Sequence, residues 1–257
     1  MATTKDAAHP KQAMQYPAGS IPHKDYHLSA QDKWTPFLPA NLAAQALEMN
    51  MFPMIGLGAT YLAAPWTVTT SGAGTVADAV TPGGGILCTT ANTAGYYSGV
   101  QAKQLFTPAA DKVICDYARV RVSHANMGFW FGVGNVQADP TGTDYTDFVG
   151  FYKAPGAATM VSKVIGNTGT TANSGTLATF VADTEVVIGY NIKLHATNPT
   201  GFFLVDGTQY GMTNDQVTQA IRILTTPPSC SAIRLGVGVS GQTYTATFVS
   251  AVGGVNK

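Results

Sequence analysis

The sequence predicts an all-β, two-sheet antiparallel sandwich preceded by an extended N-terminal arm that contains one short helix. From residue 66 onward, short stretches alternate apolar with polar residues, and turn sequences rich in Gly, Pro, Asn and Asp separate them. Residues 1–65 lack this alternation and are rich in Pro and Met. We therefore expect two parts, an arm over residues 1–65 and a β-sandwich over residues 66–257.

The clearest strand pattern covers residues 185–195, where apolar and polar side chains alternate with a period of two. Asp206-Gly207 predicts a two-residue hairpin, because a type I′ turn requires positive φ at both central residues. Residues 215–224 are compatible with a helical turn or a further strand. The same alternation predicts the other strands, at residues 112–123, 127–133, 148–153, 201–205, 232–239 and 243–251.

The arm divides into a polar leader, residues 1–33, and an apolar, partly helical anchor, residues 34–65. Residues 40–51 predict the helix, since Ala, Leu, Gln, Glu and Met favour helices and Asn41 is a suitable N-cap. The apolar side chains of the anchor have no strand pattern to bury them, so we expect them to dock into a groove of a partner. The expected anchors are Trp34, Phe37, Leu38, Leu42, Leu47, Met49, Met51, Phe52, Met54 and Ile55.

Composition excludes several classes of function. Charged residues make up 11% of the chain and the formal net charge is zero, so the surplus of positive charge that nucleic-acid binding needs is missing. The longest apolar stretch, residues 49–65, is interrupted by Pro and Gly, so we expect no membrane helix. The N-terminus lacks the apolar core of a signal peptide. We expect a soluble, reduced protein whose low net charge favours association.

The cysteines and histidines indicate neither zinc nor another metal. Cys88, Cys115 and Cys230 are far apart and odd in number. The last two fall in predicted strands and are expected to be free and buried, with one disulfide as the alternative. His23 and His27 have the i, i+4 spacing of helical metal ligands, but no third ligand accompanies them.

Two further motifs were weighed as cofactor sites. Asp139, Asp144 and Asp147 lie in a loop rich in oxygen donors, but their spacing is not that of an EF-hand. Solvated turn aspartates are the preferred interpretation, and a bound cation is the alternative. Residues 236–241 match G-x-G-x-x-G, yet a predicted strand follows instead of a helix, which favours a hairpin with close backbone approach. We therefore expect no cofactor.

Catalytic patterns are weak as well. Glycoside cleavage needs two carboxylates facing one cleft. The glutamates are Glu48, in the arm helix, and Glu185, at the start of a strand. Asp206 is expected in a turn and Asp116 as an isolated strand carboxylate. No G-x-S-x-G motif occurs, so we expect a protein that is not an enzyme.

Trp130 is the candidate ligand platform. It stands between Phe129 and Phe131, and its ring is suited to stacking against a sugar. Neighbouring residues of a strand point to opposite faces, so the three rings are also suited to filling two packing layers. Packing is the preferred interpretation.

Four segments carry a resemblance to a known group of proteins. FFLVDGTQYG at residues 202–211 resembles a hairpin of laminin-G and concanavalin A-like jelly rolls. AIRLGVGVSGQTYTATFVSAV, from residue 232 onward, is similar to the last two strands of such domains in tailed-phage virion proteins. APWTVTTSGAGTVADAV and CDYARVRVS with MGFWFGVGN resemble the same group. The resemblance covers roughly residues 62–257 and leaves the arm unexplained.

This resemblance implies a non-enzymatic virion structural protein, with a jelly-roll domain that decorates, cements or joins a phage capsid or tail. The implied partners are the major capsid protein, other virion subunits and further copies of the chain, in a virion assembled in the host cytoplasm. The same group includes sugar-binding lectins and polysaccharide lyases. A carbohydrate-binding module that recognises a host surface glycan is therefore the alternative, and a glycan lyase or hydrolase is disfavoured by the scarce carboxylates.

Overall fold

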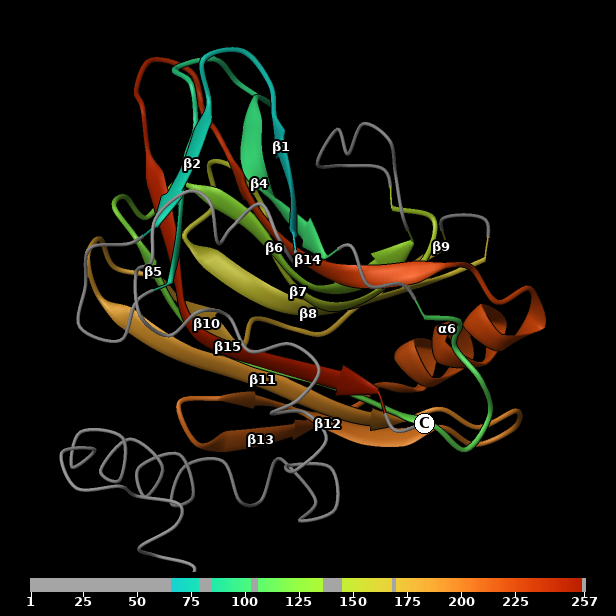
Figure 1. Ribbon diagram of the computed structural model, residues 1–257. Coiled ribbons are helices and arrows are strands. Elements are labelled where there is room, and N and C mark those ends of the chain that lie inside the picture. The colour runs from blue at the N-terminus through green and yellow to red at the C-terminus, as the bar shows by residue number, and fades with distance from the viewer. Residues whose placement is uncertain (1–65, 79–84, 103–105, 136–144, 168–169, 256–257) are drawn as a thin grey trace, which may run out of the picture. The chain divides into compact units, whose positions relative to one another are not determined.

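The computed structural model describes residues 66–78, 85–102, 106–135, 145–167 and 170–255. They form two antiparallel β-sheets that face each other, with one helix beside them (Figure 1). The prediction of an all-β, two-sheet antiparallel sandwich is confirmed. The predicted arm, with its helix at residues 40–51, lies outside the described residues.

The first sheet has eight strands, and strands distant in sequence are neighbours in it. The order is β1-β4-β14-β6-β7-β8-β10, and β9 also pairs with β8. The bounds are β1 Trp66–Thr70, β4 Tyr97–Ala102, β14 Cys230–Val237, β6 Gly128–Asn135, β7 Phe148–Lys153, β8 Thr159–Gly166, β9 Thr170–Asn173 and β10 Ala178–Thr179.

The second sheet has seven strands in the order β13-β12-β11-β5-β15-β3-β2. Its central strands β11, β5 and β15 include the most strongly alternating stretches of the sequence. The bounds are β13 Thr208–Gly211, β12 Thr200–Val205, β11 Glu185–Lys193, β5 Val113–Val122, β15 Thr245–Val255, β3 Ile86–Thr89 and β2 Thr75–Asp78.

Of the two hairpins predicted from glycine motifs, the one at Asp206-Gly207 is confirmed and the one at residues 236–241 is not. Asp206 and Gly207 join β12 to β13 with φ angles of 47° and 85°, as the type I′ hairpin requires. The Asp206 carboxylate also accepts a hydrogen bond from the Val187 backbone N–H at 2.8 Å. The hairpin predicted at residues 236–241 is wrong, because β14 and β15, on either side of these glycines, belong to different sheets. The predicted close backbone approach is present at Gly238, where a Cβ would lie 2.9 Å from the Ala91 carbonyl oxygen.

Residues 215–224 belong to a helix, α6 (Asn214–Thr225), and not to a strand. Thr213 and Gln216 close a capping box: the Thr213 hydroxyl accepts from the Gln216 N–H, and the Gln216 side chain accepts from the Thr213 N–H. Gln216, Gln219, Ala220 and Ile223 are buried at helical spacing. The Gln216 amide donates to the Ser162 hydroxyl at 2.9 Å and so fixes α6 against β8.

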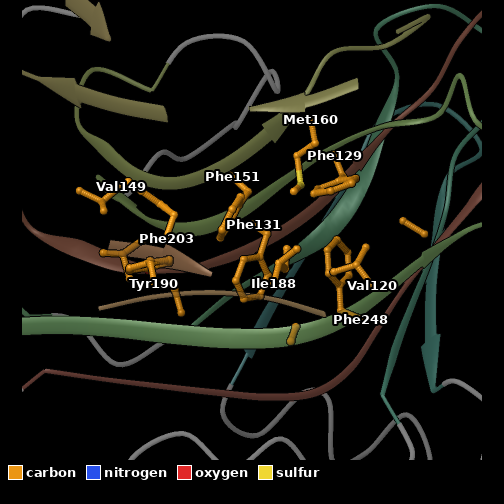
Figure 2. Packing of buried hydrophobic residues seen from close by; sticks show 14 of the residues in the cluster. Val120, Phe129, Phe131, Val149, Phe151, Met160, Ile188, Tyr190, Phe203 and Phe248 are labelled. Carbon is orange, nitrogen blue, oxygen red and sulfur yellow. The ribbon is translucent and has the colours of Figure 1, made fainter. Parts of the chain in front are cut away.

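The main core lies between the two sheets (Figure 2). Phe129, Phe131 and Phe151 of the eight-stranded sheet pack toward Tyr190, Phe203 and Phe248 of the seven-stranded sheet. These edge-to-face and stacked rings exclude water from the interior. The alternation predicts that each strand directs one set of side chains to each face of its sheet. This layer contains the set that faces the opposite sheet.

The three cysteines are buried and free, so the preferred interpretation is confirmed and the disulfide alternative is wrong. Burial raises the pKa of the Cys88 thiol to about 12, which makes it unreactive. None of the helices in the described part of the chain has the length and apolar character needed to cross a membrane.

Candidate functional site: the outer face of the eight-stranded sheet

A second cluster of buried residues lies on the face of the eight-stranded sheet that is turned away from the main core. Phe129 and Phe131 belong to the main core, so Trp130 between them projects from the opposite face. Its cluster contains Tyr97, Trp130, Tyr145, Phe148, Ile165, Ile233, Leu235 and Val237, with Tyr152 packed against them. The interpretation of β6 as a strand that fills two packing layers is confirmed.

Glycines in the middle of the sheet make room for this outer layer. Gly132 of β6 pairs directly with Gly150 of β7. A Cβ on Gly132 would lie 2.2 Å from the Val149 carbonyl oxygen and 3.0 Å from the Phe148 ring, and a Cβ on Gly150 would lie 2.9 Å from the same ring. The Phe148 ring therefore lies over a patch of bare backbone, and the aromatic layer rests close to the sheet.

Trp130 is the centre of the outer layer. Its ring centroid is 5.1 Å from that of Tyr145, 4.9 Å from Phe148 and 4.4 Å from Tyr152. The indole is only 1% exposed, and its N–H finds no hydrogen-bond partner among the described residues. Trp130 therefore supports the layer from below, while the half-buried Tyr152 is the part of it that solvent reaches.

A lysine lies on top of these rings. The Lys163 ammonium of β8 is 4.1 Å from the Tyr152 ring centroid and 4.6 Å from that of Trp130, so two aromatic faces attract one cation. Lys163 is half-buried, and desolvation lowers the pKa of its ammonium. On the neighbouring strand β9, Asn173 pairs with Lys163 and is exposed. We call Tyr152, Lys163 and Asn173 the Lys163 site.

Unused hydrogen-bonding groups lie elsewhere on the same face. Gln101 of β4 and Ser231 of β14 alternate with inward residues, which places both on the outer side. The Gln101 amide nitrogen and the Ser231 hydroxyl are both buried, and the described part of the chain offers neither of them a hydrogen-bond partner. Buried polar groups that lack a partner cost free energy.

The charge on this face is one-sided. The described strands of the eight-stranded sheet contain no Asp or Glu. Their cationic residues are Lys153, Lys163 and Arg234, and the first and last lie in the interior. Lys163 is thus the one charged residue that these strands place on the outer face.

The two interior cations have structural partners. The Lys153 ammonium donates to the backbone carbonyls of Ala125, Met127 and Ala157, the second at 2.7 Å. Arg234 donates to the Asp116 carboxylate at 2.7 Å. The expectation that Asp116 is an isolated carboxylate is therefore wrong, because its position in the alternation points it into the core toward Arg234.

The remaining carboxylates do not form an acidic site among the described residues. Asp147 is buried, not solvated: its carboxylate accepts from the Asn167 N–H at 2.8 Å and from the Thr146 hydroxyl at 3.2 Å. Glu185 forms an exposed ion pair with Arg119 at 3.5 Å. No group of three or more His, Cys, Asp or Glu within the described ranges is placed to hold a metal. The absence of a metal or cofactor in the protein stays a prediction.

Several other predicted residues lie outside the described part of the chain. Among them are Asp139 and Asp144 of the acidic loop, the histidine pair His23 and His27, and Glu48. The arm anchors also lie outside it, namely Trp34, Phe37, Leu38, Leu42, Leu47, Met49, Met51, Phe52, Met54 and Ile55.

No protein-family model and no curated protein matches this sequence. Among solved structures, the potassium-bound carbohydrate recognition domain of Emp46p matches with a TM-score of 0.51 and 9% identity over 79% of this chain and 95% of that one. Its metal-free form gives 0.50 and 10% over 80% and 96%. An endo-1,3-beta-glucanase from Streptomyces sioyaensis gives 0.47 and 14% over 74% and 90%.

The sandwich is of the concanavalin A-like type. At such low identities the likeness shows the fold alone. The function must therefore be argued from the residues of this chain.

Proposed function

We propose that this chain is a carbohydrate-binding protein and that it binds its glycan at the Lys163 site. The observation that carries this proposal is the placement of the Lys163 ammonium over the rings of Tyr152 and Trp130. A half-buried aromatic ring, a cation and an exposed amide converge there on one side of the sheet.

A sugar ring is chemically suited to this arrangement. One of its faces carries C–H groups, which pack on the negative face of an aromatic ring, and its hydroxyl groups need polar partners. Ligand sites typically combine an aromatic lining with a few polar groups that fix orientation. Tyr152 offers the ring, while Lys163 and Asn173 offer donors. The likeness to the Emp46p domain supports this choice of ligand by fold analogy.

We propose binding without hydrolysis. Most glycosidases use a pair of carboxyl groups that flank the scissile bond. The described strands of the eight-stranded sheet supply no Asp or Glu. Two strand carboxylates were candidates for this role from the sequence. Glu185 forms an ion pair with Arg119, and Asp116 forms one with Arg234.

The test is glycan-array binding by the full chain. Tyr152→Ala is expected to weaken binding about tenfold or more, the loss typical of a ring that anchors a ligand. Tyr210→Ala is the matched control, since Tyr210 is also half-buried but lies in β13 of the seven-stranded sheet. Absence of binding to every glycan, or full binding by a folded Tyr152→Ala variant, would refute the proposal.

The virion role implied by the sequence resemblance stays a prediction, as do its capsid partners, its homo-oligomer and its location in the virion. A glycan-binding domain on a virion would reconcile both hypotheses, with the arm attaching the domain to its neighbours. Deletion of residues 1–55 tests the arm. If the truncated protein joins its particle or oligomer with unchanged affinity, the arm does not provide the attachment.

A further inference from the structure

We infer that the Lys163 site selects acidic glycans, in which the carboxylate of a sugar acid pairs with the Lys163 ammonium. This inference rests on the proposed function and specifies its ligand class. It starts from the observation that Lys163 is half-buried and forms no ion pair with the residues that the structure describes.

Three ion pairs form among the described residues. They join Arg119 to Glu185, Lys193 to Asp111, and Arg234 to Asp116. In each of them a carboxylate balances the cation. Around Lys163, the described residues place the faces of two aromatic rings, which attract a cation without neutralising its charge. Removing a charge from water without a counter-ion is costly, and desolvation accordingly lowers the pKa of Lys163.

The Lys163 ammonium has donors to offer an anion. An ammonium group carries three N–H donors, and the rings of Trp130 and Tyr152, with centroids 4.6 and 4.1 Å away, accept none of them as a carboxylate does. A carboxylate that approaches from solvent is able to accept from these donors while its sugar ring lies beside Tyr152. Asn173, exposed on the adjacent strand, is in position to bind a neighbouring hydroxyl.

The electrostatics of the face favour an anion over a neutral sugar. The described strands of this sheet carry no Asp or Glu, so no carboxylate of the sheet competes for Lys163 or repels an acidic ligand. The formal net charge of the whole chain is zero, so the attraction is local and not a property of a basic protein. A carboxylate of the ligand also forms a charge-assisted hydrogen bond with the Lys163 ammonium, which compensates for the desolvation of that ammonium.

The test compares acidic polysaccharides with their neutral methyl esters, which keep the same backbone. The probes are polygalacturonate, hyaluronan and polysialic acid, each with its fully esterified form, and binding by the full chain is measured by calorimetry. At least one acid is expected to bind about tenfold or more tightly than its ester. Its affinity should fall as salt rises from 50 to 500 mM, because salt screens a partly exposed pair.

Three variants assign the effect to this lysine. Lys163→Gln should abolish the preference for acid over ester, Lys163→Arg should retain most of it, and Lys193→Gln should leave it unchanged. Lys193 is a fair control because it is an exposed lysine of the seven-stranded sheet. Thermal unfolding of each variant checks that it is folded.

The outcomes separate the two claims. Equal binding of acid and ester that is lost in Tyr152→Ala overturns the acidic selectivity and leaves the proposed carbohydrate binding intact. Acid selectivity that survives in a folded Lys163→Gln variant also overturns the inference, since another cation must then be responsible. Absence of binding to these probes and to the whole glycan array overturns both claims.

Discussion

Arg234 of β14 and Asp116 of β5 join the two sheets through an ion pair buried between them. The Arg234 guanidinium donates to the Asp116 carboxylate at 2.7 Å, and the two side chains are 1% and 0% exposed. The guanidinium also lies 4.1 Å from the Phe131 ring centroid and donates to the Ile233 carbonyl at 2.8 Å. These contacts offset the cost of placing two charges in an apolar core.

Loss of one member of this pair should destabilise the protein more than loss of both. Asp116→Ala leaves a buried guanidinium without its carboxylate, and we expect the free energy of unfolding to fall by about 3–5 kcal/mol. Asp116→Leu combined with Arg234→Met removes both charges at similar volume and should recover much of this loss. Urea denaturation measures both. A double variant less stable than Asp116→Ala would contradict the expectation.

The same pair should make stability depend on pH. Burial raises the pKa of Asp116 from 3.8 to about 7, and the opposing effect of Arg234 is smaller. Between about pH 4 and pH 7, the folded protein therefore keeps a proton on Asp116 that the unfolded chain has released. The stabilisation that this proton provides is complete below about pH 4 and is lost as the pH rises through about 7. We expect the free energy of unfolding to fall over this window, as followed by urea denaturation. The slope should vanish in Asp116→Asn, and its persistence there would assign it to another group.

The alternation of apolar and polar residues in β5 indicates that Asp116 is buried. The residue shares its phase with Ile114 and Ala118, which both face the core, so its burial was predictable from the sequence. Its pairing with Arg234 was not predictable from the sequence. Arg234 lies 118 residues away in the opposite sheet, and the alternation within a strand does not say which strands face each other.

The Lys163 site escaped prediction for a related reason. The strand β8 (Thr159–Gly166) is apolar at both phases, because Met160 and Val164 face the main core while Val161 and Ile165 face the outer layer. A strand that packs on both faces loses the period of two. Trp130 was identified because two phenylalanines flank it, but its burial beneath Lys163 depends on strand order, which the sequence does not show.

Lys153 should contribute strongly to stability although it pairs with no carboxylate in the described structure. Its ammonium is fully buried, donates to three backbone carbonyls, and has a pKa lowered to about 8 by desolvation. Lys153→Met keeps the aliphatic chain but leaves these carbonyls without a donor. Each carbonyl that water does not reach should then cost about 1–3 kcal/mol of stability. We expect a loss of roughly 3 kcal/mol or more in chemical denaturation. Lys193→Met is the exposed control and should change stability by less than about 0.5 kcal/mol.

A result below about 1 kcal/mol for Lys153→Met would mean that water replaces the ammonium. Hydrogen exchange at the N–H groups near Met127 distinguishes the two cases. Faster exchange is expected if the loops held by Lys153 open, and unchanged exchange would contradict the role of Lys153 in holding these loops together.

Substitution of Gly132 should lower both stability and glycan binding. A Cβ there would meet the Val149 carbonyl oxygen at 2.2 Å and the Phe148 ring at 3.0 Å, so Gly132→Ala must separate β6 from β7 and lift the aromatic layer. We expect a loss of about 3 kcal/mol in the free energy of unfolding. Gly175→Ala is the matched control, because nothing lies within 4 Å of its Cβ position, and its effect should stay within about 0.5 kcal/mol.

Below its lowered melting temperature, the Gly132→Ala protein should also bind glycan more weakly, since displacement of Phe148 disturbs Trp130 and, through it, Tyr152 and Lys163. Affinity measured on the folded variant at low temperature tests this coupling. Unchanged affinity in a destabilised Gly132→Ala protein would show that the outer layer supports the fold without positioning the ligand-binding side chains.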